Sequence, residues 1–313
     1  MLKRCVFALS LLALPLSASE ILTNFSSFDI PGGTNPSPEG INSAGTVVGG
    51  YNVGSLLRGF TLANNTITAP IIAPGDTGGF TLLFGINDSG EIAGEYLGNN
   101  NTYHGFLKVG SNYTTIDHTG PYSTALTGIN NAGNYVGTYG SSSAPDQGFI
   151  VINHVETDFA IGHDSFTYNM NNSNDVVGQY HDSMGVLHAF VRAPNGTVTT
   201  LVIPGSTSDT AHGINDAGTI VGSYVDSNNV RHGFVDLAGT IYTVDVAGAE
   251  DTAIRDINDS DMVIGYYVDA MGIQHGFEAL LSSTSVPEPS TWALLGVGLC
   301  AVIWRRRSKH ASA

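Results

Sequence analysis

The sequence predicts an all-β fold, a single closed six-bladed β-propeller built from four-stranded repeats of ~43 residues. The composition is the first observation, because glycine accounts for 39 and aromatic residues for 28 of the 313 positions. Runs of helix-forming residues are missing between residues 20 and 285, which favours short strands and turns. The second observation is a phrase that recurs six times, and the third is an unmatched strand-like segment before the first copy.

The repeated phrase reads Gly-Ile-Asn, a short polar turn, Val-Gly-x-Tyr and a closing Gly-Phe. Its first copy runs from Gly40 to Tyr51 and closes at Phe60. One asparagine marks each copy, and these repeat-signature residues are Asn42, Asn87, Asn130, Asn171, Asn215 and Asn258. The markers are separated by 45, 43, 41, 44 and 43 residues. A period of this size is typical of propeller blades or solenoid units.

The fifth copy shows how one repeat supplies four strands. The strands are expected at residues 211–215, 219–224, 231–235 and 239–246. Asp216 and Gly218 form the first turn, where the glycine accepts a positive φ and the carboxylate bonds nearby backbone. Gly222 lies inside the second strand, which predicts a close approach by a neighbouring strand or side chain.

The ends of the array favour a ring over an open stack. A strand ending in a turn follows most copies, for example at residues 113–117 and 242–246, but none follows Phe277. The segment 25–32 before the first copy resembles this missing strand. An open solenoid would need polar caps at both ends, and the sequence shows none. We therefore expect the N-terminal strand to complete the sixth blade.

The two ends of the chain have the features of export signals. Residues 1–19 are expected to be a signal peptide, with Lys3 and Arg4 before an apolar stretch and small residues at 17–19. The propeller is expected over residues 20–281, a linker over 282–290, and a transmembrane segment with a basic tail over 291–313. A single apolar helix is expected at each terminus.

The C-terminal segment combines three features in a fixed order. Pro287, Glu288 and Pro289 precede an apolar run, and Arg305, Arg306 and Arg307 follow it. This order resembles the PEP-CTERM sorting signal. The resemblance implies an exosortase as partner and export through the inner membrane of a Gram-negative bacterium that makes extracellular polysaccharide. The C-terminal segment would hold the intermediate in that membrane, and processing would then leave the protein at the cell surface or in the extracellular matrix.

The repeated phrase resembles the HAF family of bacterial extracellular repeats over residues 24–280. The naming triplet His-Ala-Phe occurs in the fourth copy, at His188 to Phe190, whereas glycine replaces the alanine elsewhere. The resemblance implies an exported β-repeat protein of unassigned biochemical role.

Charge and cysteine content exclude several classes of partner. Residues 20–285 carry 5 basic and 26 acidic side chains, a net charge of −21. A body so acidic repels nucleic acid and anionic membrane surfaces, so neutral glycans, proteins and cations remain as partners. The two cysteines, Cys5 and Cys300, lie in the terminal segments, so no disulfide is expected in the propeller.

Four histidines occupy the same place in their repeats: His104, His188, His232 and His275. They could form a ring of metal ligands or acid-base groups if they faced the central channel. We expect a structural role instead, with each imidazole bonded to backbone, because Arg58 and Gln147 replace histidine in two copies.

No cofactor is expected. Turn acids recur in the repeats, at Asp88, Asp216 and Asp259 and again at Asp182, Asp226 and Asp269. No loop has the ladder of acids typical of a calcium site, so turn formation is the preferred interpretation and weak calcium binding is the alternative.

The motifs favour a non-enzymatic protein. Asp117-His118, His163-Asp164 and His181-Asp182 pair a carboxylate with an imidazole, but neighbouring strand residues face opposite sides. Gly-x-Ser-x-Gly and His-Glu-x-x-His are absent from the sequence. The leading hypothesis is a surface or matrix module that binds extracellular polysaccharide or an envelope protein. The alternative is a polysaccharide hydrolase or lyase with carboxylates in one cleft.

Overall fold

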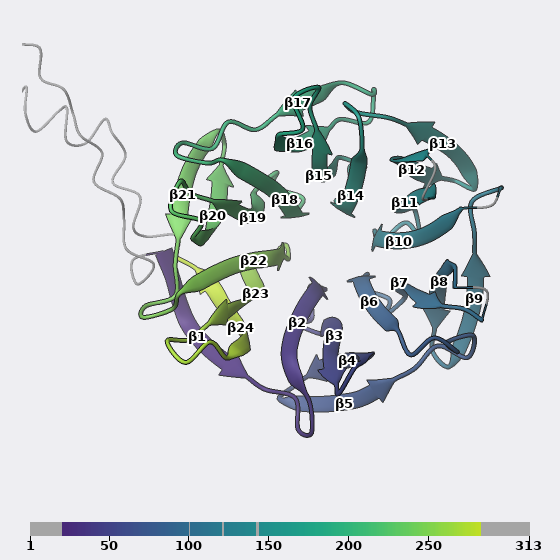
Figure 1. Ribbon diagram of the computed structural model, residues 1–313, viewed down its shortest axis with the longest axis horizontal. Coiled ribbons are helices and arrows are strands. Elements are labelled where there is room, and N and C mark those ends of the chain that lie inside the picture. Colours follow the sequence, from purple (N-terminus) through teal and green to yellow (C-terminus); the bar gives the residue numbers. More distant parts are fainter. Residues whose placement is uncertain (1–20, 100, 121, 142–143, 283–313) are drawn as a thin grey trace, which may run out of the picture. The chain divides into compact units, whose positions relative to one another are not determined.

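The computed structural model describes residues 21–282, except residues 100, 121, 142 and 143. The predicted signal peptide, both apolar helices, most of the linker, Pro287 to Pro289 and the three terminal arginines lie outside these residues. Within them the chain forms six four-stranded antiparallel sheets around a central axis (Figure 1). The all-β, six-bladed prediction is therefore confirmed.

Each blade takes its strands in chain order from the channel outward. Blade one contains β2 (Thr34–Ile41), β3 (Val47–Val53), β4 (Leu56–Ala63) and β5 (Thr66–Ile71). Blade two contains β6 (Thr81–Ile86), β7 (Ile92–Leu97), β8 (Tyr103–Val109) and β9 (Asn112–Ile116). Blade three contains β10 (Ser123–Ile129), β11 (Tyr135–Ser141), β12 (Ala144–Ile152) and β13 (Val155–Phe159).

The second half of the ring repeats this order. Blade four contains β14 (Ser165–Met170), β15 (Val176–His181), β16 (Leu187–Arg192) and β17 (Val198–Thr200). Blade five contains β18 (Ser208–Ile214), β19 (Ile220–Val225), β20 (Arg231–Leu237) and β21 (Thr240–Val244), close to the expected bounds. Blade six contains β22 (Asp251–Ile257), β23 (Met262–Val268) and β24 (Gln274–Leu281).

The fourth strand of blade six is β1 (Leu22–Phe28), from the start of the described chain. It pairs antiparallel with β24, from Leu22 opposite Leu281 to Phe28 opposite Gly276 (Figure 1). The ring is therefore closed by the N-terminal strand, as the unmatched segment predicted. Closure pairs the outer edge of the last blade, which would otherwise expose unpaired backbone groups.

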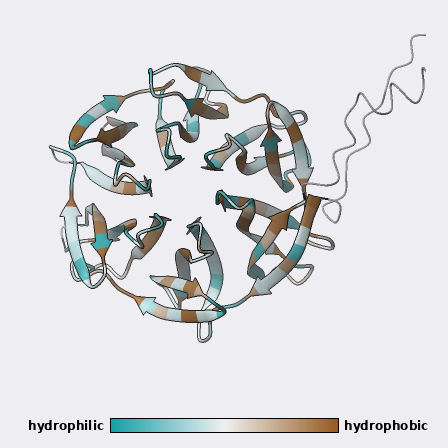
Figure 2. Ribbon diagram, turned by 180° about the vertical axis from the view of Figure 1, so that it is seen from behind, coloured by the Kyte–Doolittle hydropathy of each residue, from teal (hydrophilic) through white to brown (hydrophobic). Residues whose placement is uncertain are grey.

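A glycine and a phenylalanine facing each other form the core of every blade. The phenylalanines on the third strands are Phe60, Phe106, Phe149, Phe190, Phe234 and Phe277, and all are fully buried. In blade five, Phe234 pairs with Gly222, where a Cβ would collide with the Phe234 ring and the Thr210 carbonyl oxygen. The predicted close approach at this glycine is thus confirmed, and Figure 2 shows hydrophobic stretches along the strands of each blade.

Inner strands β2, β6, β10, β14, β18 and β22 line the central channel (Figure 1). Each ends at the residue before its marker asparagine, which begins the hairpin turn into the second strand. We call this end of the channel the hairpin mouth and the opposite end, where the inner strands begin, the loop mouth. In the stretch that the structure describes, no helix has the length and hydrophobicity required to cross a bilayer.

Candidate functional site

The six marker asparagines form a closed ring at the hairpin mouth. Each Nδ2 group donates to the carbonyl oxygen of the next marker, from Asn42 to Asn87 at 3.2 Å and around to Asn258, which donates to Asn42 at 2.8 Å. The intervening bonds, from Asn87, Asn130, Asn171 and Asn215, measure 3.1, 3.2, 3.3 and 3.5 Å. Because both the donor and the acceptor are buried, this ring fixes neighbouring blades to each other.

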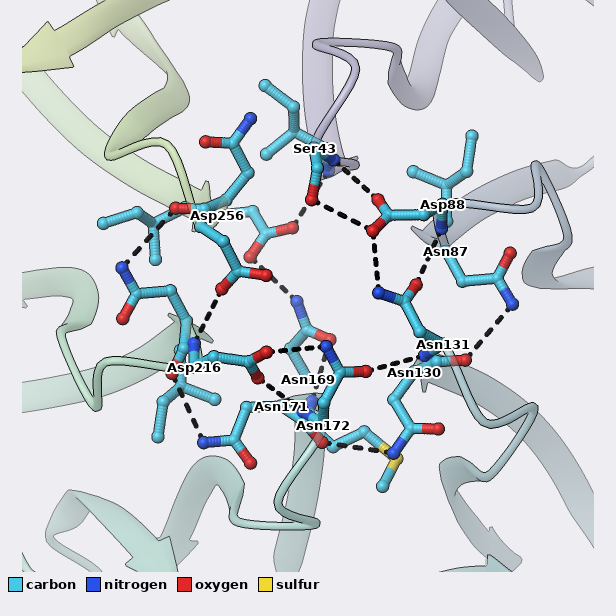
Figure 3. A pocket seen from close by; sticks show the side chains of 18 of the residues that line it. Ser43, Asn87, Asp88, Asn130, Asn131, Asn169, Asn171, Asn172, Asp216 and Asp256 are labelled. Carbon is cyan, nitrogen blue, oxygen red and sulfur yellow. Dashed lines mark hydrogen bonds between the residues drawn. The ribbon is translucent and has the colours of Figure 1, made fainter.

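A second series of hydrogen bonds lies on top of the first (Figure 3). In five blades the residue after the marker donates its backbone N–H to the side chain of its counterpart in the next blade, as Asp88 does to Asn131 at 2.8 Å. The series runs through Ser43, Asp88, Asn131, Asn172, Asp216 and Asp259. The turn acids Asp88, Asp216 and Asp259 are therefore hydrogen-bond acceptors between blades.

Below the hairpin mouth, one hydrogen bond crosses the channel. Asn169 Nδ2 on blade four donates to Asp256 Oδ1 on blade six at 2.8 Å, and Asp256 Oδ2 accepts the Ile41 N–H at 3.0 Å. The intervening blade has Gly213 at this level, where a Cβ would meet the Asp256 carboxylate. Burial raises the pKa of Asp256 to about 7, although these donors oppose the shift.

The next level toward the loop mouth is the part of the channel where the repeats differ. The residue three positions before each marker is a different amino acid in every blade: Glu39, Phe84, Thr127, Tyr168, His212 and Arg255. A position that is free to vary while its neighbours repeat is not required by the blade architecture. These six residues are the candidate functional site.

Arg255 organises one half of this level. Its Nη2 group forms a 2.9 Å ion pair with Glu39 Oε1, whose side chain is 6 % exposed. Nη1 lies 3.1 Å from the His212 ring, and His212 packs edge-on against Tyr168 with ring centroids 4.7 Å apart. Burial alone would lower the pKa of Arg255, but the carboxylate of Glu39 raises it.

His212 is held in its neutral form. Burial, followed by the charges of Arg255 and Arg231, lowers the pKa of His212 well below its usual value. A neutral imidazole can both donate and accept a hydrogen bond, so His212 supplies polarity to the channel without adding charge.

A cavity of about 360 Å³ opens beside this level. Its walls combine aromatic rings, including Phe84, Tyr103, Phe166 and Tyr168, with the charged groups of Glu39 and Arg255. The cavity lies within the ~300–1,000 Å³ range of small-ligand sites. The hairpin mouth holds a much smaller pocket of about 60 Å³, lined by the hydrogen-bonded asparagines and acids.

Glu95, on the second strand of blade two, is a further acid in the wall of the cavity. It forms no ion pair with any residue that the structure describes. Burial raises the pKa of Glu95 to about 8, so at neutral pH the carboxyl group is mostly protonated and can donate a hydrogen bond. The other blades have Gly50, Thr138, Gln179, Ser223 or Tyr266 at this position, so it also varies between repeats.

The four repeated histidines lie away from the channel, at the start of the third strands. Each bonds a carboxylate rather than the backbone that we expected: His104 with Asp117 at 2.9 Å, His188 with Asp182 at 3.2 Å, His232 with Asp245 at 2.9 Å and His275 with Asp29 at 2.9 Å. Asp182 comes from the turn before its histidine, whereas Asp117, Asp245 and Asp29 directly follow the fourth strands of their blades. The repeat alignment alone does not reveal these partners. Each imidazole also packs on the tyrosine of the preceding strand.

The three Asp-His sequence pairs have different outcomes. Asp117 bonds His104, whereas its neighbour His118 turns toward Asp158. His163 and Asp164 do bond each other, at 3.2 Å, because they lie in a bend rather than on a strand.

The third pair also separates: the Asp182 carboxylate bonds His188, and the His181 Nδ1 atom lies 3.8 Å from Asp164. Asp182, Asp226 and Asp269 each accept backbone N–H groups within their own turns, which accounts for their recurrence.

The sequence analysis did not identify this candidate functional level of the channel. When the six repeats are aligned, the position just before the nearly constant Gly-Ile-Asn holds a different residue in every repeat, and this variation was the sequence signal for the site. In a repeat protein, the recurring residues are those that the blade architecture requires, so a site specific to one protein is expected among the positions that do not recur.

Comparison with known proteins shows the sorting motif and the fold. Residues 285–307 match the PEP-CTERM protein-sorting motif, which marks an exported protein processed by an exosortase. A mutant of AofleA from Arthrobotrys oligospora is 14% identical, with a TM-score of 0.50 over 86% of this chain and 93% of that chain. A fungal lectin from Aleuria aurantia, described as a six-bladed β-propeller with a novel fucose recognition mode, is 10% identical with a TM-score of 0.50. That match covers 84% of this chain and 100% of the lectin. No curated protein matches the sequence.

Proposed function

We propose that this exported propeller is a non-enzymatic module of the cell surface or extracellular matrix that binds a short neutral segment of extracellular polysaccharide in the loop-mouth cavity. The observation that supports this most directly is the cavity of about 360 Å³, which combines aromatic rings with polar groups that differ between blades. Aromatic faces pack against sugar rings, and fixed donors and acceptors bond their hydroxyl groups.

The charge of the protein supports a neutral ligand. The one cationic group among the residues that line the cavity, Arg255, is already paired with Glu39. Asp146 adds an acidic group to the cavity wall, the protonated Glu95 adds no positive charge, and the propeller segment is strongly acidic. An anionic polysaccharide would be repelled by this surface, whereas a neutral glycan is not.

The sorting signal supports the location. An exosortase-processed protein reaches the outside of the cell, and the extracellular polysaccharide of a Gram-negative host would be present there. We further propose that the repeats belong to the HAF family. Saccharide binding by the Aleuria aurantia lectin contributes only the ligand class, because the likeness between the chains is one of fold.

Binding can be tested with variants that borrow residues from other blades. Phe84→Thr introduces the residue of blade three, Thr127, and Phe166→Ala introduces the alanine that blades three and six have at Ala125 and Ala253. We expect both to weaken binding of neutral oligosaccharides from the producing bacterium's polysaccharide at least about tenfold in calorimetric titration, because each removes an aromatic wall.

Phe25→Ala, an exposed aromatic on β1 that does not line the cavity, is the matched control and should bind normally. Equal affinity for the wild type and both cavity variants, or no binding by the wild type, would refute the proposal.

A glycan hydrolase or lyase is the second candidate, favoured by the two glutamates of the cavity. Glu39 is held in an ion pair and Glu95 is kept protonated by burial, and such a difference between two carboxyl groups suits acid-base chemistry. Release of new chain ends from the polysaccharide by the wild type, abolished by Glu95→Gln, would establish this candidate. The binding proposal expects no release from either protein.

A further inference from the structure

Blade three departs from the repeat at one outer position, where His118 replaces an apolar residue. The backbone N–H of His118 donates to Thr124 Oγ1 at 3.0 Å. Ala73 and Val246 make the corresponding bonds, to Thr81 at 3.2 Å and to Thr252 at 3.0 Å. The three residues are therefore equivalent, and in blade three an imidazole stands where other blades have a small or aliphatic side chain.

Two acids on β13 are further departures. Asp158 pairs with Phe149 in the register where Thr115, Thr200 and Thr243 pair with the phenylalanines of their own blades. Those threonine hydroxyls bond the tyrosine of the second strand, as Thr243 does with Tyr224 at 2.9 Å. Glu156, two residues before Asp158 on the same face, stands where other blades have Tyr113, Val198 or Ile241.

The three substituted side chains converge. His118 Nε2 lies 3.3 Å from Asp158 Oδ1 and 3.5 Å from Glu156 Oε1, and the three ligand atoms all lie within 4.8 Å of one another. Ligands at ~2.0–2.1 Å from a tetrahedral ion are separated by about 3.3–3.4 Å. The spacing around Nε2 therefore matches two edges of a tetrahedral coordination sphere.

The imidazole is held firmly in this position. Its ring stacks on Tyr139 with a centroid distance of 3.5 Å and an interplanar angle of 4°, and the side chain is 9 % exposed. The two carboxylates are 41 % and 46 % exposed, so an ion could reach them from solvent. A ligand whose ring is fixed before binding loses little freedom when the ion arrives.

The repeated histidines lack this convergence although they also contact acids. His232 meets Asp245 through Nδ1 and Asp226 through Nε2, and His275 meets Asp29 and Asp269 in the same way. When two carboxylates contact opposite nitrogens of one imidazole ring, they lie on opposite sides of the ring and cannot bind the same ion together with one of those nitrogens. His118 is the histidine whose single nitrogen faces two carboxylates, and within the described parts of the chain no second group of this kind is found.

We propose that His118, Glu156 and Asp158 form a binding site for a divalent transition-metal ion of the Zn²⁺ type, with water as the fourth ligand. One imidazole and two carboxylates suit Zn²⁺ better than Ca²⁺ or Mg²⁺, which prefer oxygen ligands alone. The ion would join the loop entering blade three to the outer strand of that blade. His118 Nδ1 is buried without a hydrogen bond in the described residues, so affinity should fall below that of sites whose histidines have a second partner.

The test is a calorimetric titration of the full-length chain, purified in detergent and stripped with a chelator, with Zn²⁺ alone. We expect one ion per chain. His118→Val and Asp158→Thr, each of which installs the residue of another blade, should weaken binding by about 100-fold or more. His232→Gln, which copies Gln147 of blade three, is the control and should leave the affinity unchanged.

Thermal unfolding shows whether each variant is folded, and Zn²⁺ should raise the Tm of the wild type and of the control but not of His118→Val. Glu156→Gln keeps the shape of its side chain and provides an independent ligand-removal variant. The proposal fails if the wild type does not bind Zn²⁺ saturably, or if His118→Val and Glu156→Gln both bind as tightly as the wild type.

Discussion

At the scale of single residues, the channel brings together groups whose ionisation depends on burial. Glu95 is half-buried in the cavity wall and Asp256 is buried, and burial raises their pKa values to about 8 and about 7. Glu39 lies at the same end of the channel as Glu95 but is paired with Arg255. Partners as well as burial therefore distinguish the acids of the site.

The first prediction concerns Glu95 and pH. The pKa is about 8 in the folded protein against an ordinary 4.5, so between these values the folded state retains a proton that the unfolded state has lost. Stability must therefore fall as the pH rises through this window and level off above it. We expect Glu95→Gln to match the wild type in Tm near pH 4 and to exceed it near pH 8.5.

The control for this experiment is Glu250→Gln, because Glu250 is exposed. It should shift the Tm equally at both pH values. A Glu95→Gln variant that lost stability at the higher pH would show that the ionised carboxylate is the favoured form.

The second prediction concerns the asparagine ring. Asn87 donates to the Asn130 carbonyl oxygen at 3.1 Å and to Glu91 Oε2 at 2.7 Å, and its Oδ1 accepts two backbone N–H groups of its own turn. Asn87→Ala leaves buried groups without partners and should cost about 2–3 kcal/mol in urea unfolding. Asn195→Ala, at an exposed turn, should cost under about 1 kcal/mol, and equal losses for the two variants would contradict a structural role for the ring.

At the scale of elements, each blade depends on the pairing of a second-strand glycine with a third-strand phenylalanine. Phe234→Ala should reduce the free energy of unfolding by about 3–5 kcal/mol, because it removes a fully buried ring from a tightly packed pair. Val202→Ala is the control, since Val202 is 82% exposed and should change stability little. Chemical denaturation of both variants measures the difference, and a loss below about 1 kcal/mol for Phe234→Ala would contradict this packing.

The elements also show how far sequence reasoning reaches. A period near 43 residues and a turn glycine with φ of 79° at Gly218 could be predicted, because backbone geometry constrains those positions directly. The partners of His104 and His118 could not be predicted from the sequence, because they depend on which side chains meet across strands. The cavity could not be predicted for the same reason: Glu39, Tyr168 and Arg255, which line it, lie on three different blades and come together only in the closed ring.

At the scale of the whole molecule, closure depends on β1. Removing residues 22–28 exposes the edge of β24 and should cause loss of hydrogen-exchange protection first in blade six, with a lower Tm. Ser27→Ala keeps the backbone pairing and is the control. Unchanged protection of the β24 amides in the shortened chain would show that the ring does not depend on the N-terminal strand.

The ring also explains why function is expected in the channel. Repeated residues join the blades at the hairpin mouth, whereas the level of Glu39, Tyr168 and Arg255 is free to differ and surrounds a cavity. Our central claim is that the recurring residues hold the blades together, whereas the non-recurring residues of the channel bind the ligand.

A crystal structure of the protein soaked with a neutral oligosaccharide from the producing bacterium's polysaccharide tests that claim most directly. The account predicts a sugar ring in the loop-mouth cavity, packed against Phe84 or Phe166 and hydrogen-bonded by Glu95. A sugar bound instead at the repeated histidines on the outer parts of the blades, with the cavity empty, would contradict it.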